Sequence, residues 1–274
     1  MTGFFRPSSR PARALAAAAC LLGLAGLAGC GGSQPSGSSS PTAATSSAGL
    51  SGDATVFAAA SLTGTFTELG KEFEAAYPGT KVTFNFGSSA TLATQINQGA
   101  PAGVFAAASD ATMKTVTDAG NNAGEPVSFA TNTLEIAVPK GNPGHITGLK
   151  DFADESKTIA LCAQQVPCGA AATKVFALAG ITPKPDTLES DVKATLQKVQ
   201  LGEVDAALVY KTDVIAAGDQ VEGIEFPEAA KVVNNYPITT LKAATSPEVA
   251  QAFVDYVVSP QGEQVLGKAG FGQP

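Results

Sequence analysis

Ala54–Phe66 reads Ala-Thr-Val-Phe-Ala-Ala-Ala-Ser-Leu-Thr-Gly-Thr-Phe, and this stretch decides the fold. Its β-branched and aromatic start predicts a strand. After Ser61, apolar side chains recur at spacings of three and four residues, which predicts an amphipathic helix. They are Leu62, Phe66, Leu69, Phe73 and Tyr77. Ser61 therefore stands where the helix begins, and the free backbone N–H groups of a first helical turn attract anions.

Serine is among the commonest helix caps, so one such junction does not define a site. The chain, however, repeats the arrangement. The alternating run Lys81–Phe86 predicts a second strand, and Ser89 follows it at the start of a short helix. Three later positions join the set: Cys168 at a helix start, Val192 after its expected cap Ser190, and Tyr210 at the end of an apolar strand. A core aromatic is the alternative interpretation of Tyr210.

From Asp53 onward, short apolar strands alternate with helical stretches, and Asp110 is expected to cap one of the helices. This alternation is typical of an α/β fold with mostly parallel sheets. The expected donors lie far apart in the sequence. Two Rossmann-like lobes joined by crossover strands would best bring them together in one site. We expect one lobe from residues 53–134 and 236–274, and a second from 135–235. The site then lies in the cleft between them, at the carboxyl ends of strands.

The N-terminus resembles a bacterial lipoprotein signal peptide over residues 1–29. Three arginines precede an apolar run from Ala14 to Leu27 that is too short for a stable membrane span. The run ends in Leu27-Ala28-Gly29-Cys30, which marks Cys30 as the lipidated residue rather than Cys20 inside the run. Residues 30–52 are rich in Gly, Ser and Pro and predict a flexible tether. We expect an extracytoplasmic body anchored to the outer face of the membrane.

Charge limits the class of partner, and cysteine content predicts a covalent cross-link. Removal of residues 1–29 takes three of the 17 basic residues and none of the 24 acidic ones, so the net charge falls from −7 to −10. An acidic body argues against nucleic acid as a partner. In an exported protein, Cys162 and Cys168 predict a structural disulfide, with a metal pair or a redox pair as alternatives.

The sequence argues against an enzyme. A serine nucleophile at Ser61 or Ser89 needs an adjacent base, and His145, the single histidine, stands in a Gly/Pro-rich turn. The Gly-x-Ser-x-Gly pattern is absent around both serines. A lone histidine also makes no metal site, so we assign His145 no role.

Six segments together resemble the periplasmic molybdate-binding proteins of ABC importers. They are Val-Phe-Ala-Ala-Ala-Ser-Leu-Thr (56–63), Phe-Gly-Ser-Ser-Ala-Thr-Leu-Ala-Thr-Gln-Ile-Asn-Gln-Gly-Ala-Pro-Ala (86–102), Val-Pro-Cys-Gly (166–169), Asp-Val (191–192), Leu-Val-Tyr (208–210) and Ser-Pro-Gln-Gly-Glu (259–263). They span the chain from Asp53 to its end in the family's order, and the first two are specific.

The resemblance implies a type II periplasmic-binding-protein fold, a molybdate or tungstate ligand, no cofactor, a monomer and an ABC permease as partner. It assigns hydroxyl and backbone donors to Ser61 and Ser89, a phenol donor to Tyr210, and backbone N–H donors to Cys168 and Val192. Two positions depart from the family: Cys168 stands where Ala is common, and Gly103 replaces an acidic residue. A receptor for sulfate, phosphate or another small oxyanion is the alternative within the same class.

Overall fold

Two five-stranded sheets organise the chain, and both lie within residues 49–274, the part that the computed structural model describes. The predicted signal peptide, Cys30 and the tether up to residue 48 lie outside the described residues. Gly52 already belongs to the first strand, one residue before the predicted start of the body at Asp53. In residues 49–274, no helix is long and apolar enough to cross a membrane.

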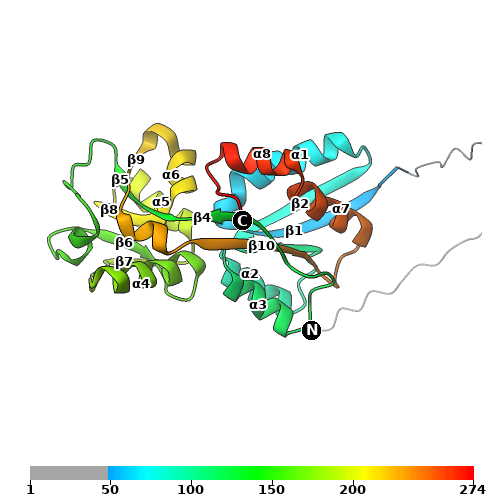
Figure 1. Cartoon of the computed structure of the whole chain (residues 1–274), viewed down its shortest axis with the longest axis horizontal. Helices are drawn as coiled ribbons and strands as arrows, with labels where there is room; N and C mark the ends of the chain where they lie inside the picture. Colours follow the sequence, from blue (N-terminus) through cyan, green and yellow to red (C-terminus); the bar gives the residue numbers. More distant parts are fainter. Residues whose placement is uncertain (1–48) are drawn as a thin grey trace, which may run out of the picture. The chain divides into compact units, whose positions relative to one another are not determined.

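The first sheet has the strand order β2-β1-β3-β10-β4 (Figure 1). β1 pairs in parallel with β2 and β3, whereas β10 runs antiparallel to β3 and β4. The strands are β1 (Gly52–Ala59), β2 (Thr80–Gly87), β3 (Val104–Ala106), β4 (Val127–Asn132) and β10 (Asn234–Thr240). The chain therefore leaves this sheet after β4 and returns to it about a hundred residues later with β10.

The second sheet has the order β7-β6-β8-β5-β9 and is also mixed. β6 pairs in parallel with β7 and β8, and β5 runs antiparallel to β8 and β9. The strands are β5 (Leu134–Pro139), β6 (Ile159–Cys162), β7 (Thr187–Glu189), β8 (Ala206–Tyr210) and β9 (Val221–Ile224). Thr133 alone separates β4 in one sheet from β5 in the other. Two α/β halves joined by extended crossovers confirm the predicted fold class, and the exact lobe boundaries stay a prediction.

Helices pack against both sheets. Those of the first half are α1 (Thr63–Ala76), α2 (Ser89–Asn97), α3 (Asp110–Asp118), α7 (Pro247–Val257) and α8 (Pro260–Lys268). Those of the second half are α4 (Pro167–Ala179), α5 (Val192–Gln200) and α6 (Lys211–Ala217). Short 3₁₀ turns are η1 (Ala60–Leu62), η2 (Leu149–Ala153), η3 (Gly218–Gln220) and η4 (Pro227–Lys231). In Figure 1, β4 and β10 lie between the two groups of helices.

Helix α1 shows why the opening stretch folds as the spacing predicts. Phe66 and Phe73 are fully buried, and their rings meet Phe253 of α7 at centroid distances of 6.0 and 5.5 Å. Gly70 lies on the same side of the helix, where a Cβ would come within 2.6 Å of the Phe84 ring. Burial of one such aromatic side chain stabilises the fold by roughly 1.5–3 kcal/mol. This packing fixes η1 and Ser61 at the end of β1.

Two helix starts in the first half differ from the prediction. Ser61 is not a cap, because it lies inside η1 and neither η1 nor α1 has a side-chain capping bond. Asp110 is the first residue of α3, and the cap is Ser109, whose Oγ accepts a hydrogen bond from the Thr112 N–H. Adjacent Ser and Asp residues can both cap a helix, so the sequence alone does not decide between them.

Candidate functional site

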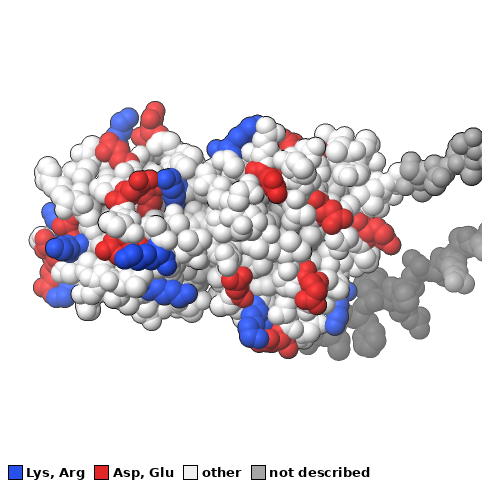
Figure 2. Space-filling model, in the orientation of Figure 1, with Lys and Arg blue, Asp and Glu red and all other residues white. Residues whose placement is uncertain are grey.

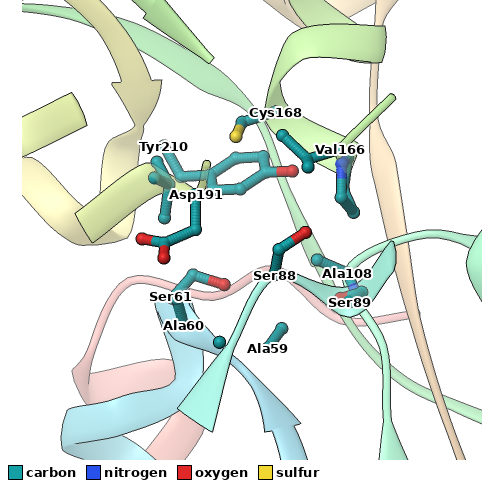
Figure 3. Close-up of a pocket in the computed structure, with 13 residues that line it drawn as sticks. Ala59, Ala60, Ser61, Ser88, Ser89, Ala108, Val166, Cys168, Asp191 and Tyr210 are labelled. Atoms are coloured by element: carbon teal, nitrogen blue, oxygen red, sulfur yellow. The ribbon is translucent and has the colours of Figure 1, made fainter. Parts of the chain in front are cut away.

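One cavity lies where strands of both sheets end (Figure 3). The segments after β1, β2 and β3 reach it from the first sheet, and the starts of α4 and α5 and the end of β8 reach it from the second. Its lining residues are Ala59, Ala60, Ser61, Gly87, Ser88, Ser89, Ala108, Val166, Pro167, Cys168, Asp191, Val192 and Tyr210. The structure thus brings together all five residues that the sequence assigned to the site.

The cavity is small. The space open to the centre of a water-sized sphere is ≈ 20 Å³, whereas a single water needs about 10–15 Å³ on this measure. Pockets for drug-sized organic ligands usually enclose about 300–1,000 Å³. The size therefore suits a compact inorganic ion better than a drug-sized organic ligand.

The start of α4 supplies one backbone N–H donor because its first residue is a proline. Pro167 occupies the first helical position and has no N–H, so the first N–H that α4 presents belongs to Cys168. Cys168 forms a disulfide with Cys162, as predicted, with a Cα–Cα distance of 5.8 Å. A Cβ at Gly169 would overlap the carbonyl group of Ala163, so the close approach requires glycine there. The disulfide ties the start of α4 to the end of β6.

The start of α5 supplies a second backbone donor. Asp191, and not the predicted Ser190, caps this helix: its Oδ1 accepts hydrogen bonds from the N–H groups of Lys193 at 2.9 Å and Ala194 at 3.0 Å. The cap uses the N–H groups at the second and third helical positions. It leaves the first, that of Val192, available to a ligand in the cavity.

Both predicted serine hydroxyls have a partner on the protein side. Ser61 Oγ lies 2.9 Å from the hydroxyl of Tyr236 in β10. Ser89 Oγ accepts a hydrogen bond of 3.0 Å from the N–H of Ala108. An N–H group can only donate, so the proton of Ser89 is free to point into the cavity.

Ser88 lines the cavity and was missed by the sequence reasoning, which chose its neighbour Ser89. It is 6% exposed, and its Oγ has no hydrogen-bond partner among the described residues. Figure 3 shows this hydroxyl directed into the space below Tyr210. Ser88 is the residue before α2 and makes no capping bond. The Gly87-Ser88-Ser89 run was a signal for it, but the choice between two adjacent serines needs the backbone geometry.

Tyr210 closes the cavity from the second sheet with a buried side chain, 1% exposed. Burial raises the pKa of its hydroxyl well above the ordinary value, and Tyr236 and Asp213 act in the same direction. Tyr210 therefore stays protonated and can donate. Its ring meets the ring of Tyr236 edge-on, at 6.0 Å between centroids. Tyr210 is thus both a core aromatic and a cavity residue, so the two interpretations of its sequence position are compatible.

The cavity carries no Lys, Arg or His side chain, and Asp191 is its single charged lining residue. On the face drawn in Figure 2, basic and acidic side chains are interspersed over both halves of the body. His145, at a positive φ of 51°, and Gly103 are not lining residues. Within residues 49–274, no group of three His, Cys, Asp or Glu side chains could hold a metal ion. The hydrogen-bond donors of the site are therefore all neutral groups.

Comparisons of both the sequence and the structure with known proteins find proteins that bind small solutes. Residues 54–272 match the family model described as bacterial extracellular solute-binding protein. The molybdate-binding protein ModA of Mycobacterium tuberculosis H37Rv is 42% identical over 219 residues, 80% of this chain and 84% of that protein. The periplasmic molybdate-binding protein of Azotobacter vinelandii superposes with a TM-score of 0.69 at 22% identity, over 81% and 99% of the two chains. The sulfate-binding protein SubI of M. tuberculosis gives 0.71 at 16%, over 80% and 86%.

The molecule has two α/β halves, and a small cavity lined by hydrogen-bond donors lies where their strands end. This arrangement is that of a solute receptor. The chain belongs to the family of bacterial extracellular solute-binding proteins. This confirms the resemblance drawn from the sequence. Members of this family bind solutes for transport and are not enzymes, and they work outside the cytoplasm.

Proposed function

We propose that this protein captures molybdate outside the cytoplasm and delivers it to an ABC importer in the membrane. The observation that carries the proposal is the convergence of neutral donors on one ion-sized cavity. Hydroxyl groups come from Ser61, Ser89 and Tyr210, and backbone N–H groups come from Cys168 and Val192. The 42% identity with the mycobacterial molybdate-binding protein supports the choice of ion.

The donor set suits a tetrahedral dianion. Each hydrogen bond to a charged oxygen contributes about 1.5–3 kcal/mol, so five to seven of them can offset the hydration that the ion loses. Donors from both sheets approach from opposite sides, as four oxygens in a tetrahedron require. Ser88 adds a fourth hydroxyl group to the cavity lining, and we include it in the proposed ligand set.

Selectivity then follows from protonation state and size. A cage of donors favours an ion that is fully deprotonated at neutral pH over one that carries its own proton. Molybdate and sulfate share charge and shape, so cavity size must separate them. Tungstate has nearly the size of molybdate, and we expect it to bind about equally well.

Titration calorimetry with molybdate, tungstate, sulfate and phosphate tests the proposal. Molybdate and tungstate should bind tightly, and a thousand-fold excess over Kd should stabilise the protein by about 4 kcal/mol in thermal unfolding. Sulfate that raises the melting temperature as much as molybdate does would remove the assignment to molybdate.

A sulfate receptor is the second candidate, because sulfate is a tetrahedral dianion that the same donors could bind; a sulfate-binding protein also shares the fold. Fold similarity at 16% identity says nothing about the ion. The calorimetric comparison separates the two candidates directly, since a sulfate receptor should bind molybdate more weakly than sulfate.

A serine-nucleophile enzyme has no support in the site geometry. In the described part of the chain, the hydroxyl of Ser61 faces Tyr236 and that of Ser89 faces the N–H of Ala108, so neither has a histidine or carboxylate as base. Labelling of either serine by a fluorophosphonate would revive this hypothesis.

The membrane attachment belongs to the proposal as well. We propose that Cys30 is lipidated after removal of residues 1–29, and that the body acts as a monomer. Palmitate labelling in cells should be lost in Cys30→Ala and kept in Cys20→Ala. Labelling that survives Cys30→Ala would contradict the assignment, and a dimer in gel filtration would contradict the monomer.

A further inference from the structure

Strand β10 passes behind the cavity and directs two side chains toward it. Asn234 and Tyr236 are two residues apart, so they lie on one face of the strand. Both are buried, with exposed fractions of 8% and 0%. Neither lines the cavity, yet each contacts a residue that does. β10 is also one of the two chain segments that join the halves of the molecule.

Asn234 contacts both halves. Its Nδ2 donates hydrogen bonds to the carbonyl oxygen of Ala108 at 2.8 Å and to the hydroxyl oxygen of Tyr210 at 3.0 Å. An amide nitrogen has two protons and no acceptor. The oxygen of Tyr210 must therefore accept from Asn234, and its own proton cannot point back along the same line. That proton can therefore point to an anion in the cavity.

Tyr236 makes the corresponding contact in the first half. Its hydroxyl lies 2.9 Å from Ser61 Oγ, and Asn132 Nδ2 donates to the same hydroxyl from 3.5 Å. Either hydroxyl can donate in the pair with Ser61, and when Asn132 donates to the oxygen of Tyr236, the proton of Tyr236 can point to Ser61. Burial raises the pKa of Tyr236, so this proton is retained at neutral pH. Ser61 then accepts from Tyr236, and its own proton is free to point into the cavity.

We propose that Asn234 and Tyr236 are positioning residues that set the direction of the hydroxyl groups of Tyr210 and Ser61. Each holds a hydroxyl oxygen from behind, so that its proton points at the bound oxyanion. The inference rests on the proposed function, because it assumes an anion in the cavity. Hydroxyl groups oriented in advance lose no rotational freedom when the ion binds, and this strengthens binding.

Two double-mutant cycles, measured by titration calorimetry with molybdate, test the proposal. Tyr236→Phe keeps the ring and removes the donor, and it should weaken binding about tenfold. In a Ser61→Ala background the same change should have almost no further effect, because Tyr236 acts through that hydroxyl. Asn234→Ala should likewise weaken binding in the wild-type protein and lose most of its effect in a Tyr210→Phe background.

Tyr256→Phe is the matched control. Tyr256 lies on α7, and its hydroxyl donates to Glu72 at 3.2 Å on the surface. It should bind molybdate as the wild type does. Melting temperatures without ligand show whether each variant folds, and the Asn234 cycle decides the matter if Tyr236→Phe does not fold.

Two results would overturn the proposal: unchanged affinity in Tyr236→Phe and Asn234→Ala, or losses that are equally large with and without the partner hydroxyl. A merely structural role predicts the second result. A wild-type protein that ignores molybdate but binds sulfate refutes only the proposed ion, and the same cycles are then run with sulfate.

Discussion

The ammonium group of Lys193 lies 2.9 Å from Oδ1 of Asp213, a carboxylate with no exposed surface. This ion pair joins α5, which begins at Val192, to α6, which begins directly after Tyr210. It therefore links the two helices that begin at, or directly after, two lining residues of the cavity, Val192 and Tyr210.

Asp213 makes stability depend on pH in a direction unusual for an acid. Burial raises its pKa above the ordinary value of 3.8, and Lys193 offsets this only in part. The folded state thus holds the proton more firmly than the unfolded chain. The contribution of Asp213 to the free energy of unfolding is therefore present below pH 3.8 and declines as the pH rises to the folded-state pKa.

Asp213→Asn should remove this decline. Urea unfolding at a series of pH values should show the variant gaining stability relative to the wild type as the pH rises from 3.8 toward neutral. A difference between the two proteins that stays constant over this range would contradict the raised pKa.

Loss of a single proposed donor should weaken binding without unfolding the protein. We expect Ser61→Ala and Tyr210→Phe each to reduce the free energy of molybdate binding by at least about 1 kcal/mol. Ser156→Ala, at an exposed position outside the cavity, is the control. Calorimetry measures the affinity and circular dichroism the fold. Wild-type affinity in both variants would remove these residues from the site.

Ser88→Ala should act on binding and on stability in opposite directions. Its buried hydroxyl has no partner in the described protein, so its removal should leave the ligand-free melting temperature unchanged or higher. With molybdate present the variant should bind about tenfold more weakly, since one hydrogen bond to the ion is gone. A lower ligand-free melting temperature with unchanged affinity would exclude Ser88 as a donor.

Asp191 caps α5 and also places a negative charge in the cavity lining, and Asp191→Asn separates these two effects. Asparagine caps a helix about as well as aspartate, so the free energy of unfolding should change by only a few tenths of a kcal/mol. The substitution also removes a negative charge from the cavity lining, and molybdate should therefore bind more tightly at low salt. Asp191→Ala is the contrast: it removes two capping hydrogen bonds and should cost about 1 kcal/mol of stability.

The disulfide should stabilise the fold more than it contributes to binding. Replacement of both Cys162 and Cys168 by Ala should lower the free energy of unfolding by about 2 kcal/mol, because a closed loop in the unfolded chain is lost. The ligand contact proposed for Cys168 is its N–H group, which alanine retains. Affinity should therefore stay within about threefold of the wild type. Thiols that react with iodoacetamide in the native, unreduced protein would instead favour the redox alternative.

The sequence predicted which chain segments form the site better than it predicted the role of each residue in them. Strand-to-helix junctions at Ser61 and Ser89 were visible because apolar spacing changes from two to three and four at those points. The contributions of Ser88 and Asp191 were not visible, since two neighbouring polar residues compete for each cap. Their roles depend on the backbone angles at the junction.

The residues behind the cavity could not be predicted at all. Asn234 contacts Ala108 across 126 positions, and Tyr236 contacts Ser61 across 175. Nothing in the local sequence of β10 marks these partners, because they depend on how the returning strand pairs with β3 and β4. Crossover topology was predictable from the alternation of elements, and the register of the last strand was not.

The edge-on pair formed by Tyr210 and Tyr236 has a practical value. The chain contains no tryptophan and only four tyrosines, so these two rings make up half of its tyrosine fluorophores. Their emission is not masked by an indole group elsewhere. Filling of the cavity should therefore change the intrinsic fluorescence of the protein, which gives an optical signal for ion capture without any attached dye.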